Sequence, residues 1–344
     1  MNIHGMIWFS RIGLIVAAVT ATLGGGAIAA QTAVKFTLDS KYEGPTAPFL
    51  VGLDRGYYKA EELNVTIDEA ADPIESISRV ASGAYDLGFA DINLLIKFRD
   101  QNPAAPIKAV FMVYNKPAFA IVGRKSRGVI LPKDLEGKKL GAPAADSAYA
   151  YWKIFAQANS INSAKVEIEN IGFPVREPML QNGQVDAITG LSFAVLPNLK
   201  SMGVPANDIV VLLMADHGVT LYGNAIIVNP KFAAEKPEAV KAFLRAFLKG
   251  LKDTVKNPTR TFDSVLKRND ATKKDVELER LHMILRENVL THEVKAHGYG
   301  DVDPARLDKA IEQIALTYEF KTKPKAADIF NASFLPAAAL RKAN

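Results

Sequence analysis

The pattern of apolar and polar positions in this chain repeats after about one hundred residues. Residues 63–91 read LNVTIDEAADPIESISRVASGAYDLGFAD, and residues 164–192 read AKVEIENIGFPVREPMLQNGQVDAITGLS. Each stretch opens with the alternation typical of a strand, passes a proline into a short helix that a glycine ends, and resumes as a strand after Gly-x-x-Asp. The repeat predicts two similar α/β domains.

A further strand, loop and helix pattern precedes each copy of the repeat, at residues 35–58 and 138–160. Strands that alternate with helices favour parallel sheets with right-handed crossovers, in which ligands bind beyond the carboxyl ends of the strands. If the two domains face each other, four loops converge on one cleft. These loops are residues 39–46, 90–92, 144–147 and 190–192.

Two strand-like runs, residues 108–124 and 220–230, are candidates for segments that cross between the domains. We expect the crossings near residues 118–120 and 221–225. The predicted division is a signal segment of residues 1–30, a discontinuous first domain of residues 31–120 plus 222–344, and a second domain of residues 121–221.

The first thirty residues differ from the rest of the chain. A lone positive charge, Arg11, precedes the apolar residues 12–19, and small residues follow as far as Ala30. This order predicts a secretory signal peptide cleaved near Ala29 or Ala30, with an uncleaved membrane anchor as the alternative. Because the chain has no cysteine that could carry a lipid, we expect a periplasmic protein.

The charge of the chain is mild, at +5 with neutral histidines. Loss of Arg11 with the signal peptide would leave about +4. Lysine and arginine are scattered and face acids on the predicted helices, so the sequence does not predict a nucleic-acid partner. The composition, 49% hydrophobic and 23% charged, is typical of a globular protein, and we expect a monomer.

The sequence carries no motif for catalysis, metal binding or a cofactor. Neither a Gly-x-Ser-x-Gly elbow nor a Walker-type phosphate loop occurs. His292 and His297 lack a pattern of further metal ligands around them, and His217 is left open between packing and ligand contact. We therefore expect no catalytic residue, no metal and no cofactor.

Candidate ligand-binding side chains lie on or beside the four loops and the crossings. Aromatic residues supply rigid contact area and polar ones fix orientation, while core packing is the alternative for the aromatic members. The candidates are Ser40, Tyr42, Thr46, Asp91, Asn115, Asp146, Ser147, Tyr149, Trp152, Ser192, Phe193 and Tyr222.

The predicted cleft is more acidic than basic. If Asp146 caps the helix that follows it, its carboxylate occupies the N–H groups that would otherwise attract an anion. Asp39 and Asp91 add negative charge, and only Lys41 and Arg176 can oppose them. These charges favour a neutral or cationic polar ligand with an aromatic or amine part, with taurine or a sulfonate as the alternative.

Five segments carry a resemblance to a known family: APFLVGLDRGYYKAEELNV, ASGAYDLGFAD, LPKDLEGKKLGAPAADSA, NGQVDAI and NASFLP. The chain resembles the solute-binding proteins of ABC importers, in the branch of taurine, alkanesulfonate, nitrate and thiamine-pyrimidine binders. The resemblance covers nearly all of the chain after the signal segment. It implies an α/β fold of the type II periplasmic binding protein class, with two crossing hinge strands. It also implies a small-molecule ligand, an ABC permease and its ATPase as partners.

Some members of this family are enzymes that make a pyrimidine from their own histidine and depend on a cysteine-rich motif. Since this chain has no cysteine, we expect a binding protein and not an enzyme. Two alternatives remain open. One is an exported enzyme that uses an acid in the cleft as a base, and the other is a protein that presents its ligand to a sensory receptor.

Overall fold

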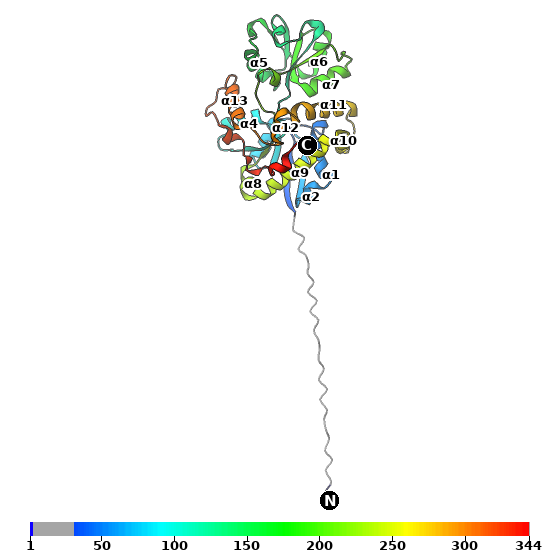
Figure 1. Ribbon diagram of the computed structural model, residues 1–344, viewed down its shortest axis with the longest axis vertical. Helices are drawn as coiled ribbons and strands as arrows, with labels where there is room; N and C mark the ends of the chain where they lie inside the picture. Colours follow the sequence, from blue (N-terminus) through cyan, green and yellow to red (C-terminus); the bar gives the residue numbers. More distant parts are fainter. Residues whose placement is uncertain (3–30, 344) are drawn as a thin grey trace. The chain divides into compact units, whose positions relative to one another are not determined.

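The computed structural model describes residues 1–2 and 31–343 (Figure 1). The predicted signal peptide and its cleavage position near Ala29 or Ala30 lie outside the described residues. From residue 31 onward the chain forms one compact unit. Within the described ranges, no helix is both long and apolar enough to cross a membrane.

Two five-stranded sheets organise the fold, and each has one antiparallel strand among parallel ones. The first, sheet A, has the order β2-β1-β3-β10-β4, and the second, sheet B, has the equivalent order β7-β6-β8-β5-β9. The strands of sheet A are β1 (Thr32–Thr37), β2 (Leu63–Asp68), β3 (Leu87–Asp91), β4 (Lys108–Met112) and β10 (Asn224–Val228). Those of sheet B are β5 (Phe119–Arg124), β6 (Lys139–Ala142), β7 (Glu167–Asn170), β8 (Ala187–Leu191) and β9 (Ile209–Leu213).

The two sheets of equivalent strand order correspond to the two copies of the repeat in the sequence. The predicted α/β fold is confirmed. The chain passes between the sheets twice, through residues 113–118 after β4 and residues 214–223 after β9. These two stretches are called the crossing segments below. The exact domain boundaries stay a prediction.

Three α-helices belong to the part of the chain that builds sheet B: α5 (Trp152–Ala158), α6 (Phe173–Asn182) and α7 (Ser192–Ser201). The others lie before β5 or after β10. They are α1 (Ala47–Asp54), α2 (Tyr57–Ala60), α3 (Pro73–Ala81), α4 (Ile92–Gln101), α8 (Pro230–Glu235), α9 (Pro237–Lys256), α10 (Pro258–Leu266), α11 (Lys274–Ile284), α12 (His292–His297), α13 (Pro304–Ala315), α14 (Ala326–Ile329) and α15 (Ala338–Arg341).

Local sequence signals explain where these helices begin and end. Asp72 caps α3 by accepting a hydrogen bond from the N–H of Glu75 at 2.8 Å, and the Glu75 carboxylate accepts one from the N–H of Ala71, one residue before the cap. Gly183 ends α6 with φ +80°, a conformation that glycine adopts without strain. After Gly183 the chain leaves α6 and continues into strand β8.

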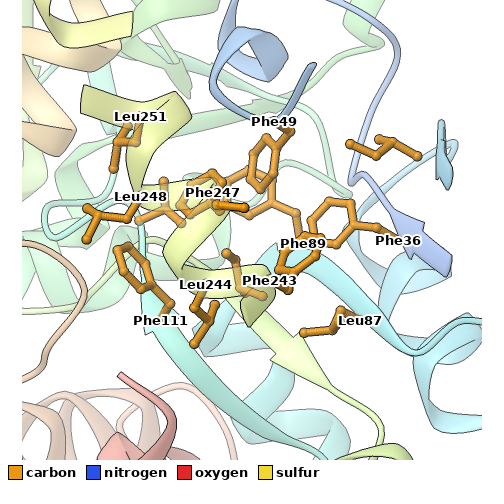
Figure 2. Close-up of a cluster of buried hydrophobic side chains, with 14 of the residues drawn as sticks. Phe36, Phe49, Leu87, Phe89, Phe111, Phe243, Leu244, Phe247, Leu248 and Leu251 are labelled. Atoms are coloured by element: carbon orange, nitrogen blue, oxygen red, sulfur yellow. The ribbon is translucent and has the colours of Figure 1, made fainter. Parts of the chain in front are cut away.

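A large hydrophobic core lies where α9 packs on α1 and sheet A, as Figure 2 shows. The rings of Phe49 and Phe247 stack with centroids 4.5 Å apart, and Phe36 and Phe243 lie 5.1 Å apart. All four rings are almost fully buried, and stacked aromatic pairs add to the free energy gained from buried area. This core holds β1 and β3 rigid up to their carboxyl ends.

Candidate functional site

A cavity of about 290 Å³ lies where the carboxyl ends of strands from both sheets meet the crossing segments. Each of the four loops predicted to converge contributes to its wall. The lining residues are Asp39, Ser40, Glu43, Pro45, Ala71, Asp72, Pro73, Asp91, Tyr114, Pro117, Ala118, Phe119, Ser147, Leu191, Phe193, Ala194, Gly223, Asn224 and Arg280. This space is called the cleft cavity below.

Four of the candidate residues border the cleft cavity: Ser40, Asp91, Ser147 and Phe193. Ser40 follows β1 and Asp91 ends β3, while Ser147 and Phe193 come from the sheet B part of the chain. The cavity wall therefore draws on both halves of the fold. The roles of these residues in ligand binding stay predictions.

Two further candidates make local contacts beside the cavity and do not line it. The Tyr42 hydroxyl donates a hydrogen bond to the carbonyl of Ile67 at 2.8 Å. The Thr46 hydroxyl donates one to the carbonyl of Glu43, also at 2.8 Å, in the turn before α1. Both side chains support the loop that carries Ser40.

The remaining aromatic candidates pack in the interior. Trp152 and Tyr222 belong to the core beside sheets A and B, and Tyr149 packs against it half-buried. Ser192 is fully buried at the start of α7, where its N–H donates to the carbonyl of Ala118. These residues lie away from the cavity wall because the local backbone, helical for all but Tyr222, turns them toward the core.

The carboxyl groups of Asp39 and Asp91 are the chemically most unusual groups in the cleft cavity. Burial, together with a smaller contribution from the like charge of Asp91, raises the pKa of Asp39 to about 7. Burial also raises the pKa of Asp91 to about 6, although this carboxyl caps α4 by accepting from the N–H groups of Asn93 and Leu94. Near neutral pH Asp39 is therefore partly protonated and can donate as well as accept hydrogen bonds, whereas Asp91 is mostly ionised and accepts them.

Asn224 fixes the position of Asp39. Its amide donates to the Asp39 carboxylate at 2.6 Å, and Asn224 is the first residue of β10, directly opposite Asp91 in the ladder. The second crossing segment thereby reaches β10 at the place where the two acids meet. The sequence did not single out Asn224, since an asparagine at the start of a strand carries no motif.

Asp146 caps the turn after β6, as the sequence predicted. Its partner Arg176 does not line the cleft cavity. Asp146 accepts from the N–H of Ala148 at 2.6 Å and from Arg176 at 3.1 Å, and Arg176 also pairs with Glu177 at 2.6 Å. All three side chains are nearly buried. Arg176 is therefore neutralised inside the sheet B part, and exposed Lys41 is not in the cavity wall either.

Arg280 on α11 is a cavity residue that sequence reasoning missed. Its side chain lines the cleft cavity, and it is the only cation among the described lining residues. A single arginine in a charged helix late in the chain gives no sequence signal, because its position depends on how the end of the chain folds back over the first loops.

A second, more open cavity of about 850 Å³ lies beside the crossing segments. It contains the candidate Asn115, whose amide oxygen accepts from the hydroxyl of Thr291 at 2.8 Å. His292 borders it, whereas His217 packs edge-on against Phe155. Among the described residues, no group of three or more potential ligands forms a metal site.

Two sheets of equivalent strand order, two crossing segments and a cavity at the strand ends define the fold of the periplasmic binding proteins. The chain belongs to the NMT1/THI5-like family, whose model matches residues 45–261. The fold is similar to that of the periplasmic aliphatic sulphonate binding protein SsuA from Escherichia coli. The TM-score is 0.68 with 14% identity, over 86% of this chain and 91% of that one.

The periplasmic nitrate-binding protein NrtA from Synechocystis PCC 6803 also has this fold, with a TM-score of 0.64, 12% identity, and coverage of 90% and 88%. Several relatives found by comparing sequences have a higher sequence identity to this chain than these two structures have. A riboflavin-binding protein from Chloroflexus aurantiacus is 29% identical over 63% of this chain and 61% of its own length. A formylaminopyrimidine-binding protein from Halalkalibacterium halodurans is 27% identical over 68% of this chain and 71% of its own length.

The expectation that the protein is not an enzyme is wrong as a deduction from its sequence. A 4-amino-5-hydroxymethyl-2-methylpyrimidine phosphate synthase from Schizosaccharomyces pombe is 25% identical over 62% of this chain and 63% of its own length. Relatives from Legionella pneumophila and Aspergillus parasiticus carry the same name. Enzymes and binding proteins thus match this chain to similar extents.

Proposed function

We propose that this protein binds a small, polar, ring-bearing molecule in the cleft cavity and serves as the solute-binding component of an ABC importer. One observation carries the proposal: the cavity wall is built jointly by the strand ends of both sheets and by the two crossing segments. In such a site each half supplies only part of the contacts, so that binding favours closure of the halves on the ligand.

The size of the cleft cavity supports a ligand with one ring. At about 290 Å³ it lies at the lower end of the roughly 300–1,000 Å³ typical of small-molecule sites. Riboflavin, with three fused rings and a sugar-like chain, would need a wider cavity. A pyrimidine, as in the name of the second relative, suits this volume better.

The charge of the cleft cavity supports a neutral or cationic ligand. Four acids, Asp39, Glu43, Asp72 and Asp91, border it. A ring that carries amino groups can donate to the Asp39 and Asp91 carboxyls, and the rings of Tyr114, Phe119 and Phe193 offer flat apolar contact. An alkanesulfonate would instead bring a fixed negative charge toward four acids.

Calorimetric titration tests this proposal. The wild type and Asp91→Asn are titrated with 4-amino-5-hydroxymethyl-2-methylpyrimidine and with ethanesulfonate. We expect the pyrimidine to bind the wild type and to bind Asp91→Asn more weakly. Tight sulfonate binding that is unchanged or improved in Asp91→Asn would contradict the charge argument. Chromatography of the recovered ligand records whether it has been altered.

Export completes the proposal. A solute-binding component acts outside the inner membrane, which fits the signal-like composition of residues 1–30. Mass spectrometry of protein from the periplasm should find a chain that begins at Ala30 or Gln31. An intact Met1 on exported protein would contradict cleavage. Co-purification with a membrane permease would distinguish an importer from a sensory receptor as the partner.

A further inference from the structure

Arg280 contributes to the contact between the sheet B part of the chain and the helices near its end. It lies on α11, after the last residue of the family match, and its guanidinium donates to the amide oxygen of Asn198 on α7 at 2.9 Å. Lys200 and Glu279 form an ion pair between the same two helices. Helix α7 follows β8 of sheet B, so these contacts connect the sheet B part to the end of the chain across the cleft cavity.

The Asn198 contact continues through buried polar groups to the opposite wall of the cavity. The Asn198 amide donates to the Glu177 carboxylate at 3.4 Å. Glu177 pairs with Arg176, and Arg176 pairs with Asp146, which caps the turn that holds Ser147 in the cavity wall. A change at Arg280 therefore has a connected path of hydrogen bonds to the second side of the cavity.

Arg280 has more donors than the protein provides acceptors for. A guanidinium carries five N–H donors. The described residues supply contacts from Glu43 at 3.5 Å, Glu277 at 3.2 Å and Asn198 at 2.9 Å, and the buried Nε has no acceptor. The side chain is only 15% exposed, so unpaired donors on this charge are costly and an additional acceptor would stabilise the site.

Another group of residues in the wall of the cleft cavity carries carboxyl groups. Asp39 and Asp91 meet there beside Asn224, at the ends of β1 and β3. The cavity thus has one arginine at α11 and two carboxyl groups near the crossing segments. A ligand in the cavity can therefore meet both the donors of Arg280 and the carboxyl groups of Asp39 and Asp91.

We propose that Arg280 is both a latch between the two halves and a specificity-determining residue for the ligand. It closes α11 on α7 through Asn198, and its spare N–H groups receive a carbonyl or carboxylate oxygen of a ligand whose amino group faces Asp39 and Asp91. The ligand is therefore a small ring compound with a donor at one end and an acceptor at the other. The ligand half of this inference rests on the proposed function, whereas the latch does not.

A double-mutant cycle without ligand tests the latch. Unfolding of the wild type, Arg280→Gln, Asn198→Ala and the double variant is followed in urea. If the contact exists in solution, the fold-changes that the two single variants cause in the unfolding equilibrium constant do not multiply to the fold-change of the double variant, and the discrepancy is about tenfold. If the fold-changes of the single variants multiply to that of the double variant, the proposed latch is wrong.

A pair of probes tests the ligand half. Formylaminopyrimidine, whose formyl oxygen is an acceptor, is compared by calorimetry with the same aminopyrimidine lacking the formyl group. We expect the wild type to prefer the formyl compound by about tenfold and Arg280→Gln to bind both alike. Arg245→Gln is the matched control, because Arg245 pairs with Glu61 away from the cavity. It should keep the preference.

The outcomes separate the two proposals. A preference that survives in Arg280→Gln would overturn the role of Arg280 in specificity while leaving the binding function intact. If neither probe nor any member of a panel of small ring compounds binds the wild type, the proposed function fails and the ligand half fails with it. The ligand-free cycle then still decides whether Arg280 latches the two halves.

Discussion

The guanidinium carbon of Arg306 lies 3.8 Å from the centroid of the Tyr222 ring. From this position Arg306 donates hydrogen bonds to the carbonyls of Asn115 at 2.8 Å and Leu221 at 2.9 Å, which belong to different crossing segments. It also pairs with Glu293 at 2.6 Å. One side chain of α13 therefore holds both crossing segments against the end of the chain.

Replacement of Arg306 should destabilise the protein strongly. Arg306→Met keeps the apolar stem but leaves the Asn115 and Leu221 carbonyls and the Glu293 carboxylate without their donor. We expect a loss of about 2–4 kcal/mol in the free energy of unfolding, measured in urea. Arg245→Met, which removes one half-exposed ion pair with Glu61, should cost less than about 1 kcal/mol. Equal losses in the two variants would contradict the role assigned to Arg306.

The pKa of Asp39, raised by burial to about 7, predicts how stability depends on pH. In the unfolded chain this carboxyl has a pKa of about 3.9. Between these values the folded protein binds more protons than the unfolded chain, so the free energy of unfolding contributed by Asp39 is complete below about pH 4 and is lost as the pH rises through about 7.

Asp39→Asn should remove this contribution. We expect the variant to be stabilised relative to the wild type more at pH 8 than at pH 5, since the amide that replaces the carboxylate carries no charge to be desolvated and can still accept from Asn224. Urea unfolding at both pH values measures the difference. A variant whose relative stability does not change with pH would show that Asp39 titrates normally.

The buried cation Arg176 should be essential for stability at neutral pH. Arg176→Met leaves the nearly buried Asp146 and Glu177 without a counter-charge, and loss of one partner from such a cluster costs about 3–5 kcal/mol. Burial already raises the pKa of Asp146, and removal of Arg176 raises it further, so the loss should be smaller at pH 5 than at pH 8. Denaturant midpoints at the two pH values check both statements.

A matched variant on the surface provides the control for Arg176. Lys139 and Glu167 form an exposed ion pair between the neighbouring strands β6 and β7. Lys139→Met should change the free energy of unfolding by less than about 1 kcal/mol at either pH. A comparable loss in this variant would mean that charge removal in general, and not burial of the Asp146 cluster, explains the effect.

Gly223 sits where the two crossing segments touch. A Cβ at this position would lie 2.8 Å from the Cβ of Tyr114 and 3.0 Å from its carbonyl oxygen. Gly223→Ala should therefore push the segments apart, cost about 1–3 kcal/mol and weaken ligand binding, as measured by unfolding and calorimetry. Gly172→Ala, where the nearest atom is 3.6 Å away, should cost less than about 1 kcal/mol and leave binding unchanged.

The repeat in the sequence was enough to predict the α/β fold because residues close in sequence specify where each strand and helix begins and ends. A strand, a proline-started helix and a stopping glycine are each specified by residues close in sequence, as Asp72 and Gly183 illustrate. The loops at the strand ends followed from the topology of parallel sheets. The positions of Ser40 and Asp91 in the cavity wall could therefore be anticipated.

Side chains on helices were harder to place. Trp152 and Tyr222 are near the cleft in sequence but turn into the core, because the direction of a helical or crossing side chain depends on packing against distant segments. Arg280 and Arg306 reach the cavity and the crossing segments only after the last seventy residues or so have folded back. No spacing rule within the sequence encodes that arrangement.

Sheet A cannot be completed until late in synthesis. Strand β3 pairs with β10, which leaves the ribosome about 130 residues after it, behind every strand of sheet B. Until then β3 has one unpaired edge, and the aromatic core under α9 cannot form. Sheet B is contiguous and has no such delay. The part of the nascent chain that forms sheet A therefore stays incompletely folded until β10 and α9 have been made, about 90 residues before the last residue of the sequence, while sheet B can already form.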